Sequence, residues 1–170
     1  MSKLVRRVAG PKVSDEWQTP RAVFDAVCRD FGMRTLDAAA HTQNALCPQF
    51  WGPGSTLRPD ALATNWTLYP TLRLWCNPPY SQPLLAQFVD KFLAADVNGV
   101  MLVPASVETR WFQKVMETGR CHEVRFVRKR IRFERPGGGT AVQAMFPSAL
   151  LIKHLSVPPR RPSVDYWHWE

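Results

Sequence analysis

Hydrophobic residues follow two spacings along the chain, and each spacing predicts a different element. Apolar residues recur three or four positions apart, as on one face of a helix, within 19–31, 83–95 and 109–118. Apolar runs of strand length occupy 33–40, 73–76, 99–104, 121–127, 130–134 and 146–154, and 60–62 form a short strand or a turn. Helix and strand patterns alternate through the middle of the chain, and strands follow one another near its end. This order predicts an α/β fold with a mostly parallel sheet and an antiparallel C-terminal hairpin.

The first predicted helix carries its own boundary signals. Thr19 followed by Pro20 predicts an N-cap with proline at the first helical position. Val23, Phe24 and Val27 share one face of the helix, and the glycine at 32 is expected to end it.

Length and composition bound the organisation of the molecule. With 170 residues, 45% of them hydrophobic, the chain is large enough for one domain with its own core. The patterns place that domain at 15–155, between a flexible basic arm at 1–14 and a proline-rich, aromatic tail at 156–170 whose structure they do not predict. The 22 basic residues exceed the 14 acidic ones and give a formal charge of +8. This excess favours a polyanionic partner, with nucleic acid first and an acidic membrane surface second.

Cysteine spacing and hydropathy indicate the cellular compartment. The four cysteines are scattered, with no close pair and no histidine at metal-ligand spacing, so neither a zinc site nor a disulfide framework is expected. The N-terminus lacks the apolar core of a signal peptide, and no run approaches the roughly 20 apolar residues of a membrane span. We therefore expect a cytoplasmic protein without a metal or a membrane partner.

The most informative stretch is Asn77-Pro78-Pro79-Tyr80, which follows the apolar run 73–76 and is called the elbow below. Two prolines remove two backbone donors and fix two φ angles, so the chain leaves the strand rigidly. The Asn77 amide oxygen and the Pro78 carbonyl could together accept both hydrogens of an exocyclic amino group. Tyr80 could stack on an aromatic base, a contact worth about 1–3 kcal/mol. The elbow therefore predicts group transfer onto an aryl amine; the alternative is a structural proline turn anchored by Tyr80.

Two aspartates lie where a ligand of such a sheet is expected. The strand predicted within 33–40 ends in Asp37, which is followed by small alanines that would let a ligand approach the backbone. In open α/β sheets, ligands bind beyond the carboxyl ends of the strands. Asp60 follows a proline, a pair typical of turns. Each aspartate also has an ordinary interpretation as a turn or capping residue, which the sequence leaves open.

The order of these motifs resembles that of a known family. An Asn-Pro-Pro-Tyr motif after an apolar strand is typical of S-adenosylmethionine-dependent amino-methyltransferases, including enzymes that act on ribosomal RNA and on protein glutamine. The region 17–153 resembles the phage-type DNA N6-adenine methyltransferase family. The matching segments are 17–20, 36–40, 60–62 with Trp66, 77–81, 102–105, 111–112 and 130–133. The resemblance implies a Rossmann-like, S-adenosylmethionine-dependent methyltransferase fold.

The resemblance also assigns roles to individual residues. The cofactor S-adenosylmethionine would be contacted by Trp17, Thr19, Pro20, Asp37, Ala38, Ala39, Asp60, Ala61 and Asn77. The catalytic set would be Asn77, Pro78, Pro79 and Tyr80, acting on adenine flipped out of double-stranded DNA. The compartment would be the cytoplasm, which is that of a bacterial host if the protein is encoded by a phage or prophage. The chain departs from the family pattern after Asp37, where the usual glycine-rich turn is absent. No acidic residue lies between Asp37 and Asp60 to bind the ribose hydroxyls.

Basic residues gather between positions 125 and 135. Six cations fall within these eleven residues, with Glu134 the one acid among them, and this density predicts phosphate contacts. The alternative is an exposed, charged pair of strands. The residues expected to bind DNA are Arg110, Arg128, Lys129, Arg130 and Arg132.

Two other functions stay open on the sequence alone. One is a methyltransferase with the same elbow that acts on RNA or protein. The other is a DNA-binding relative without activity, since the glycine-rich turn is missing. The sequence predicts neither the recognition site nor the oligomeric state.

Overall fold

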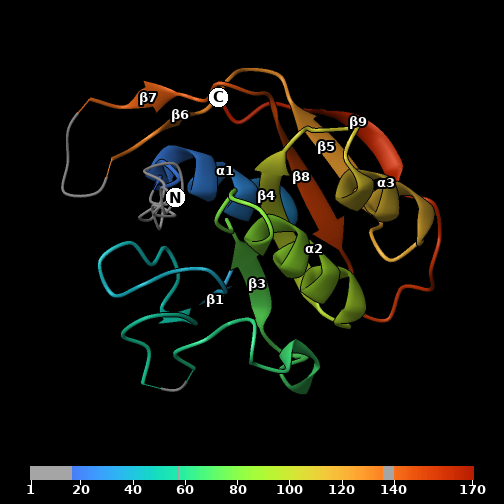
Figure 1. Ribbon diagram of the computed structural model, residues 1–170, viewed down its shortest axis with the longest axis horizontal. Coiled ribbons are helices and arrows are strands. Elements are labelled where there is room, and N and C mark those ends of the chain that lie inside the picture. The colour runs from blue at the N-terminus through green and yellow to red at the C-terminus, as the bar shows by residue number, and fades with distance from the viewer. Residues whose placement is uncertain (1–16, 57, 136–139) are drawn as a thin grey trace, which may run out of the picture.

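The computed structural model describes residues 17–56, 58–135 and 140–170 (Figure 1). Its helices are α1 (Arg21–Phe31), α2 (Leu84–Ala94) and α3 (Arg110–Glu117), with a short 3-10 turn, η2 (Trp66–Leu68). Its strands are β1 (Leu36–Asp37), β2 (Gln49–Phe50), β3 (Arg73–Cys76), β4 (Asn98–Pro104), β5 (Glu123–Val127), β6 (Arg132–Phe133), β7 (Val142–Gln143), β8 (Ser148–Lys153) and β9 (Ser163–Trp167). The three helices and six of these strands match predicted segments to within one residue or fall inside them.

Within the described ranges, seven strands form one sheet in the order β2-β1-β3-β4-β8-β5-β9. β2, β1, β3 and β4 run parallel to one another, and β9 is parallel to β5. β8 lies between β4 and β5 and is antiparallel to both. The predicted α/β fold with a mostly parallel sheet is confirmed, and the arrangement is consistent with a Rossmann-like methyltransferase fold. The carboxyl ends of β1, β3, β4 and β5 meet at one edge of the sheet.

Helices cover both faces of the sheet. Alternate strand residues point to opposite faces, so each strand contributes side chains to both layers. Leu74 and Cys76 of β3 pack in one apolar cluster with α2 and α3, and Trp75 packs in a second cluster with α1. Figure 1 shows α2 and α3 in front of the sheet. Strands that are buried on both faces read as nearly continuous apolar runs, which is why β3, β4 and β8 stand out in the sequence.

The start of α1 differs from the prediction. Pro20, and not Thr19, is the N-cap residue, and no side chain caps this helix. Pro20 has φ −57° and ψ 140°, so its extended ψ delays the helix to Arg21. The Thr19 hydroxyl therefore stands one residue too early to reach the first helical N–H groups. Gly32 ends the helix as predicted, with a φ of 85° that favours glycine.

The antiparallel hairpin predicted near the C-terminus is present. β6 pairs with β7, and this hairpin stands apart from the main sheet. The run at 146–154 forms β8 inside the sheet and does not lie beside β6. All six residues of β8 are buried, as a central strand requires, whereas β6 exposes Arg132 and buries Phe133. Figure 1 shows the β6–β7 hairpin extending outward near α1.

Part of the tail expected at 156–170 belongs to the sheet. β9 pairs along its whole length with β5 at the sheet edge. Trp167 at its end is buried, and its indole Nε1 donates a hydrogen bond of 2.8 Å to a carboxylate oxygen of Asp30. This bond ties the end of the chain to α1, so the ordered fold continues beyond residue 155.

Three other sequence expectations concern compartment and organisation. The basic arm at 1–14 lies outside the described residues, so its flexibility stays a prediction. None of the helices that the structure does describe is long and apolar enough to cross a membrane. The four cysteines are free thiols, and those at 47, 76 and 121 are buried.

Candidate functional site

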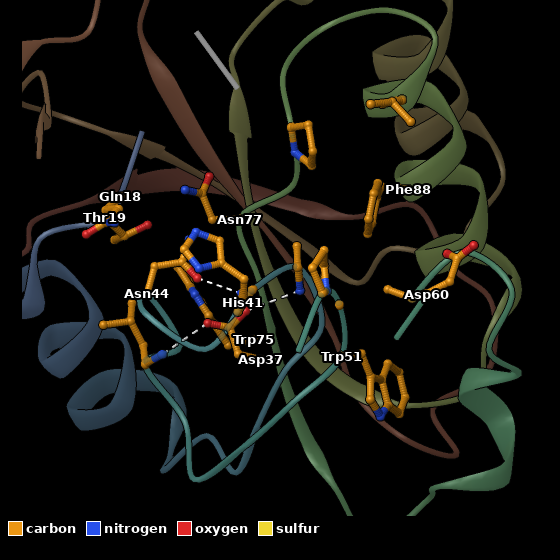
Figure 2. A pocket seen from close by; sticks show the side chains of 18 of the residues that line it. Gln18, Thr19, Asp37, His41, Asn44, Trp51, Asp60, Trp75, Asn77 and Phe88 are labelled. Carbon is orange, nitrogen blue, oxygen red and sulfur yellow. Dashed lines mark hydrogen bonds between the residues drawn. The ribbon is translucent and has the colours of Figure 1, made fainter. Parts of the chain in front are cut away.

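A cavity of about 710 Å³ lies at the carboxyl ends of β1 and β3. Ligands of open α/β sheets bind at that edge, and the volume lies within the roughly 300–1,000 Å³ of small-molecule sites. It is lined by the residues before α1, the end of β1 with the loop that follows, the turn at 59–62, the end of β3 with the elbow, and the first turns of α2. In Figure 2 the labelled side chains form a mostly polar group on one side, Gln18, Thr19, Asp37, His41, Asn44 and Asn77, and a second group on the other, Trp51, Asp60 and Phe88.

Most residues predicted to bind a cofactor line this cavity. They are Trp17, Thr19, Asp37, Ala39, Asp60, Ala61 and Asn77, joined from the catalytic set by Pro79. Four predicted residues lie outside the lining: Pro20, Ala38, Pro78 and Tyr80. Ala38 is fully buried, and its N–H donates to the Trp75 carbonyl at 2.8 Å, so it joins β1 to β3. The roles of all these residues stay predictions.

Asp37 is buried at the end of β1 and holds the loop that follows. Its two carboxylate oxygens accept one hydrogen bond each, from the N–H groups of Ala39 and Leu46, both at 3.2 Å. Such bonds favour the charged form, but burial outweighs them and raises the pKa of Asp37 to about 6. The buried carboxyl group therefore fixes the loop and still carries a negative charge at neutral pH.

The loop after β1 closes without the glycine-rich turn that the family pattern usually has. The Trp51 N–H donates to the Asp37 carbonyl at 2.8 Å, and the Ala40 N–H donates to the Trp51 carbonyl at 3.3 Å. Gly52 follows with a φ of 141°, and a Cβ placed there would stand 2.0 Å from the Ala40 carbonyl oxygen. A single glycine, twelve residues after Ala40, thus gives the close backbone approach that shapes this wall of the cavity.

Asp60 is a turn residue that also lines the cavity. It is exposed, and its Oδ1 accepts hydrogen bonds from the N–H groups of Leu62, at 2.8 Å, and Ala63, at 3.2 Å. These bonds make it the cap of its own turn. The Lys91 ammonium donates to the Leu62 carbonyl and fixes the same turn against α2. Asp60 and the buried Ala61 nevertheless line the cavity.

Two buried oxygens at the cavity wall have no hydrogen-bond partner among the described residues. They are the Thr19 hydroxyl and the amide oxygen of Asn77. An unsatisfied buried polar atom costs about 1–3 kcal/mol, so such atoms are rare unless a ligand meets them. Thr19 reaches this position because it does not cap α1, and Asn77 because two prolines follow it. Both atoms are suited to accept hydrogen bonds from a bound group.

Tyr80 points away from the cavity toward the β6–β7 hairpin. Its hydroxyl donates a long hydrogen bond of 3.5 Å to the Leu102 carbonyl. Its ring meets Phe133 edge-on at 6.3 Å between centroids and Phe146 at 5.7 Å. Burial raises the pKa of Tyr80, so the phenol is neutral at physiological pH. The elbow thus separates two environments, with Asn77 and Pro79 facing the cavity and Tyr80 facing aromatic side chains.

Several lining residues were not predicted as site residues. His41, Asn44 and Trp51 are three of them, all in or next to the loop that follows β1. The His41 N–H donates to the Asn44 side chain at 2.7 Å, and its ring Nδ1 accepts from the Gln43 N–H at 3.2 Å. Phe88 has the helical spacing of a core residue, which conceals its place in the lining. Their positions depend on loop closure, for which the sequence offers no periodic signal.

The acidic residues of the cavity are well separated in sequence and in Figure 2, where Asp37 and Asp60 lie on opposite sides. Across 17–56, 58–135 and 140–170, no group of three or more His, Cys, Asp or Glu side chains could hold a metal ion. The cavity therefore presents hydrogen-bonding and apolar groups to a ligand.

The predicted DNA-binding residues are all exposed and lie near the same edge of the sheet. Arg110 begins α3, and the other four follow β5 or belong to β6. Arg128 lies over the Tyr166 ring at 5.2 Å, Lys129 pairs with Glu170, and Arg130 donates to the Ala144 carbonyl at 3.1 Å. Their contact with DNA stays a prediction.

Comparison with known proteins supplies the family. A family model described as DNA N-6-adenine-methyltransferase (Dam) matches residues 9–163. A DNA N-6-adenine-methyltransferase of Escherichia phage T1 is 32% identical over 108 residues, which cover 62% of this chain and 42% of that relative. The chain thus matches less than half the length of the phage protein. The family predicted from the order of motifs is confirmed, and the chain belongs to the DNA N-6-adenine-methyltransferase family.

Proposed function

We propose that this chain transfers a methyl group from S-adenosylmethionine to the exocyclic N6 amine of adenine in double-stranded DNA. The observation that carries the proposal is the Asn77 amide oxygen, which is buried and has no partner among the described residues. It lies at the wall of a cavity of suitable size, directly after a strand and before two prolines. Membership of the DNA N-6-adenine-methyltransferase family supports both the reaction and the base.

The cavity residues fit the proposed cofactor, which when bound supplies an electrophilic methyl group. Thr19 and Asp37 would hold its polar amino-acid end, since one offers an unpartnered hydroxyl and the other a negative charge at neutral pH. Asp60, Ala61 and the Phe88 ring would surround its adenine on the other side of the cavity. An adenine ring needs apolar surface with a few polar contacts, which this second group of residues provides.

The elbow would position the target amine. The Asn77 amide oxygen and the Pro78 carbonyl each accept one N–H of the adenine amine, which keeps the nitrogen lone pair directed at the cavity. As positive charge grows on that nitrogen, the two acceptors stabilise it without having to reorient. Two prolines hold these acceptors in a fixed geometry, and Tyr80 supplies an aromatic surface for the base.

DNA binding and base flipping complete the proposal. The amine of a paired, stacked adenine is inaccessible, so the base must leave the duplex before it can reach the elbow. The exposed cations at 128–132 would bind the phosphates, which fixes the duplex without reading its sequence.

The test is methyl transfer from tritium-labelled S-adenosylmethionine to unmethylated plasmid or phage DNA, followed by digestion to nucleosides. Label in N6-methyldeoxyadenosine that disappears with Asn77→Ala would support the proposal. Label in RNA or protein would assign another substrate to the same elbow. Saturable DNA binding without cofactor binding or transfer would identify a non-catalytic relative.

A further inference from the structure

The short segment 144–147, between β7 and β8, exposes a methionine on an anchored backbone. Met145 is 91% exposed, the highest value among the large apolar side chains that the structure describes. The residues on either side are held: the Ala144 N–H donates to the Ile131 carbonyl at 2.9 Å, and the Pro147 carbonyl accepts from the Ala105 N–H at 2.8 Å. Met145 is therefore a projecting apolar side chain at a fixed position.

This segment touches the elbow. The Phe146 ring lies 5.7 Å from the Tyr80 ring, at an interplanar angle of 60°. Tyr80 follows Pro79, which lines the cavity. Met145 thus directly precedes Phe146, whose ring contacts the segment proposed to hold the base.

Cations flank the methionine. The Arg130 guanidinium donates to the carbonyl of Ala144, and Arg132 pairs in the hairpin register with Gln143, two residues before Met145. An apolar side chain with two arginines on neighbouring segments does not fit an apolar protein partner, but it fits DNA, whose charged backbone encloses an apolar base stack.

Exposed apolar residues are common and by themselves indicate nothing. Met33 is such a residue, since it is 66% exposed in the segment between α1 and β1, at the amino end of the strand. That position is at the opposite end of β1 from Asp37 and the cavity. Met33 therefore serves as a matched control for Met145.

We propose that Met145 is a wedge that enters the base stack of duplex DNA as the target adenine leaves it. The inference rests on the proposed function and adds a residue that opens the duplex. Apolar side chains, methionine among them, insert between base steps and compensate for lost stacking. Methionine suits this place because its unbranched thioether adapts to an irregular gap.

The first experiment compares methyl transfer to duplex and to single-stranded DNA of the same sequence. A single strand needs no opening, so Met145→Ala should lower transfer to the duplex by about tenfold or more and change transfer to the single strand by less than about twofold. Met145→Leu should retain most duplex activity, and Met33→Ala should match the wild type on both. Equal losses on both substrates, or no loss on the duplex, would overturn the wedge.

A second experiment does not depend on catalysis. A fluorescent duplex is prepared fully paired or with one abasic site, and binding of the full chain is titrated. The wild type should bind the abasic duplex several-fold more tightly than the paired one, because Met145 fills the space left by the missing base. Met145→Ala should lose that preference. If the wild type transfers no methyl group to DNA, the proposed function fails, and this preference still decides the wedge. A wild type without preference, or a preference unchanged in Met145→Ala, contradicts it.

Discussion

The elbow faces the cavity on one side and the β6–β7 hairpin on the other, and the two sides differ in which groups are left without a partner. On the cavity side, loops are closed by backbone hydrogen bonds, yet the Asn77 and Thr19 oxygens are buried without partners among the described residues. On the hairpin side, Tyr80 is packed by aromatic edges, while the cations at 128–132, which precede Phe133, are exposed. The first side is preformed for a small ligand with hydrogen-bond donors. The second side is an open surface that a large polyanion would complete.

Charge follows the same division. Asp37 places a buried carboxylate at the cavity, and the cluster at 128–132 places positive charge beyond Tyr80. A cationic cofactor and an anionic nucleic acid would each meet opposite charge on its own side of one rigid segment. In the proposed reaction the two prolines would serve alignment, because reacting groups bound from opposite sides must meet at a fixed distance.

The largest expected effect sharpens the cavity side. Asn77→Ala should lower methyl transfer by about 100- to 1,000-fold, the usual cost of removing one fixed group that stabilises transition-state charge. The free energy of unfolding should not fall, because the amide oxygen that is removed has no partner among the described residues and its burial is unfavourable. Turnover and urea unfolding of the same preparations measure both quantities.

Asn65 offers the contrasting control. Its side chain accepts a hydrogen bond from the Thr67 N–H and caps η2, away from the cavity. Asn65→Ala should lower the free energy of unfolding by about 1 kcal/mol and leave turnover unchanged. If Asn77→Ala instead behaved like Asn65→Ala, the elbow would be a structural turn.

The second prediction concerns pH and Asp37. Burial raises its pKa from 3.8 to about 6, so the folded state favours the protonated carboxyl. The resulting stability is fully present below about pH 4 and is lost as pH rises through about 6, for a total of about 3 kcal/mol. The free energy of unfolding of the wild type should therefore fall by that amount relative to Asp37→Asn between pH 4 and pH 8.

The comparison with Asp37→Asn cancels groups that titrate equally in both proteins. Saturating S-adenosylmethionine should reduce the difference at pH 8, because a bound cation favours the charged carboxylate. A difference that does not change with pH would show that hydrogen bonds from Ala39 and Leu46 offset the burial of Asp37.

The sequence predicted β3 and the elbow better than the segments that line the cavity beside them, for physical reasons. β3 and the elbow are local features: an apolar run sets the strand, and prolines set its end. Thr19 was wrongly predicted as an N-cap, because the extended ψ of Pro20 moves the helix start by one residue. The Gly52 contact with Ala40 closes a loop, and no local pattern encodes such a contact.

The edge strand β9 was not predicted from the sequence either. β9 exposes four of its five residues, so it has neither an apolar run nor a clear alternation. Its place depends on β5 as a partner and on the Trp167 bond to Asp30, both distant in sequence. β8 was recognised as a strand from its apolar run, but its partners were not, because periodicity identifies a strand and not its neighbours.

The third prediction tests the hairpin side. Replacing Lys129, Arg130 and Arg132 together with Gln should weaken DNA binding by about 10- to 100-fold for every sequence. The slope of log affinity against log salt should fall by about 0.9 for each phosphate that the variant no longer neutralises. Fluorescence anisotropy titrations at several salt concentrations measure both. An unchanged slope would place the DNA surface elsewhere.

The structure ranks these three cations. Lys129 is paired with Glu170 and Arg130 with a carbonyl, whereas the exposed Arg132 side chain on β6 has no hydrogen-bond or ion-pair partner in the described part of the chain. Arg132→Gln alone should therefore cause the largest single loss. Lys114→Gln, which removes the same charge from an ion pair with Asp90 on the helices, should leave DNA binding nearly unchanged.

The smallest expected effect concerns the link between the two sides. Gln18 and Glu134 exchange two backbone hydrogen bonds, of 3.0 and 2.9 Å, which join the cavity wall to the end of β6. Beside this bridge, the Arg135 guanidinium lies 5.5 Å from the centroid of the Trp17 ring, which lines the cavity. An exposed cation–π contact is worth about 0.5–1 kcal/mol, so Arg135→Gln should weaken cofactor binding by about two- to fivefold.

Arg128→Gln is the matched control, since it removes one charge and one cation–π contact, on Tyr166, away from the cavity. Calorimetric titration with S-adenosylmethionine, without DNA, should show weaker binding for Arg135→Gln than for Arg128→Gln. Because both variants lower the net charge equally, a general electrostatic effect would weaken them equally, and that result would mean that the hairpin does not support the cavity wall. A selective loss would mean that the two sides of the elbow are mechanically joined, so that DNA held at the hairpin can alter how firmly the cofactor is held.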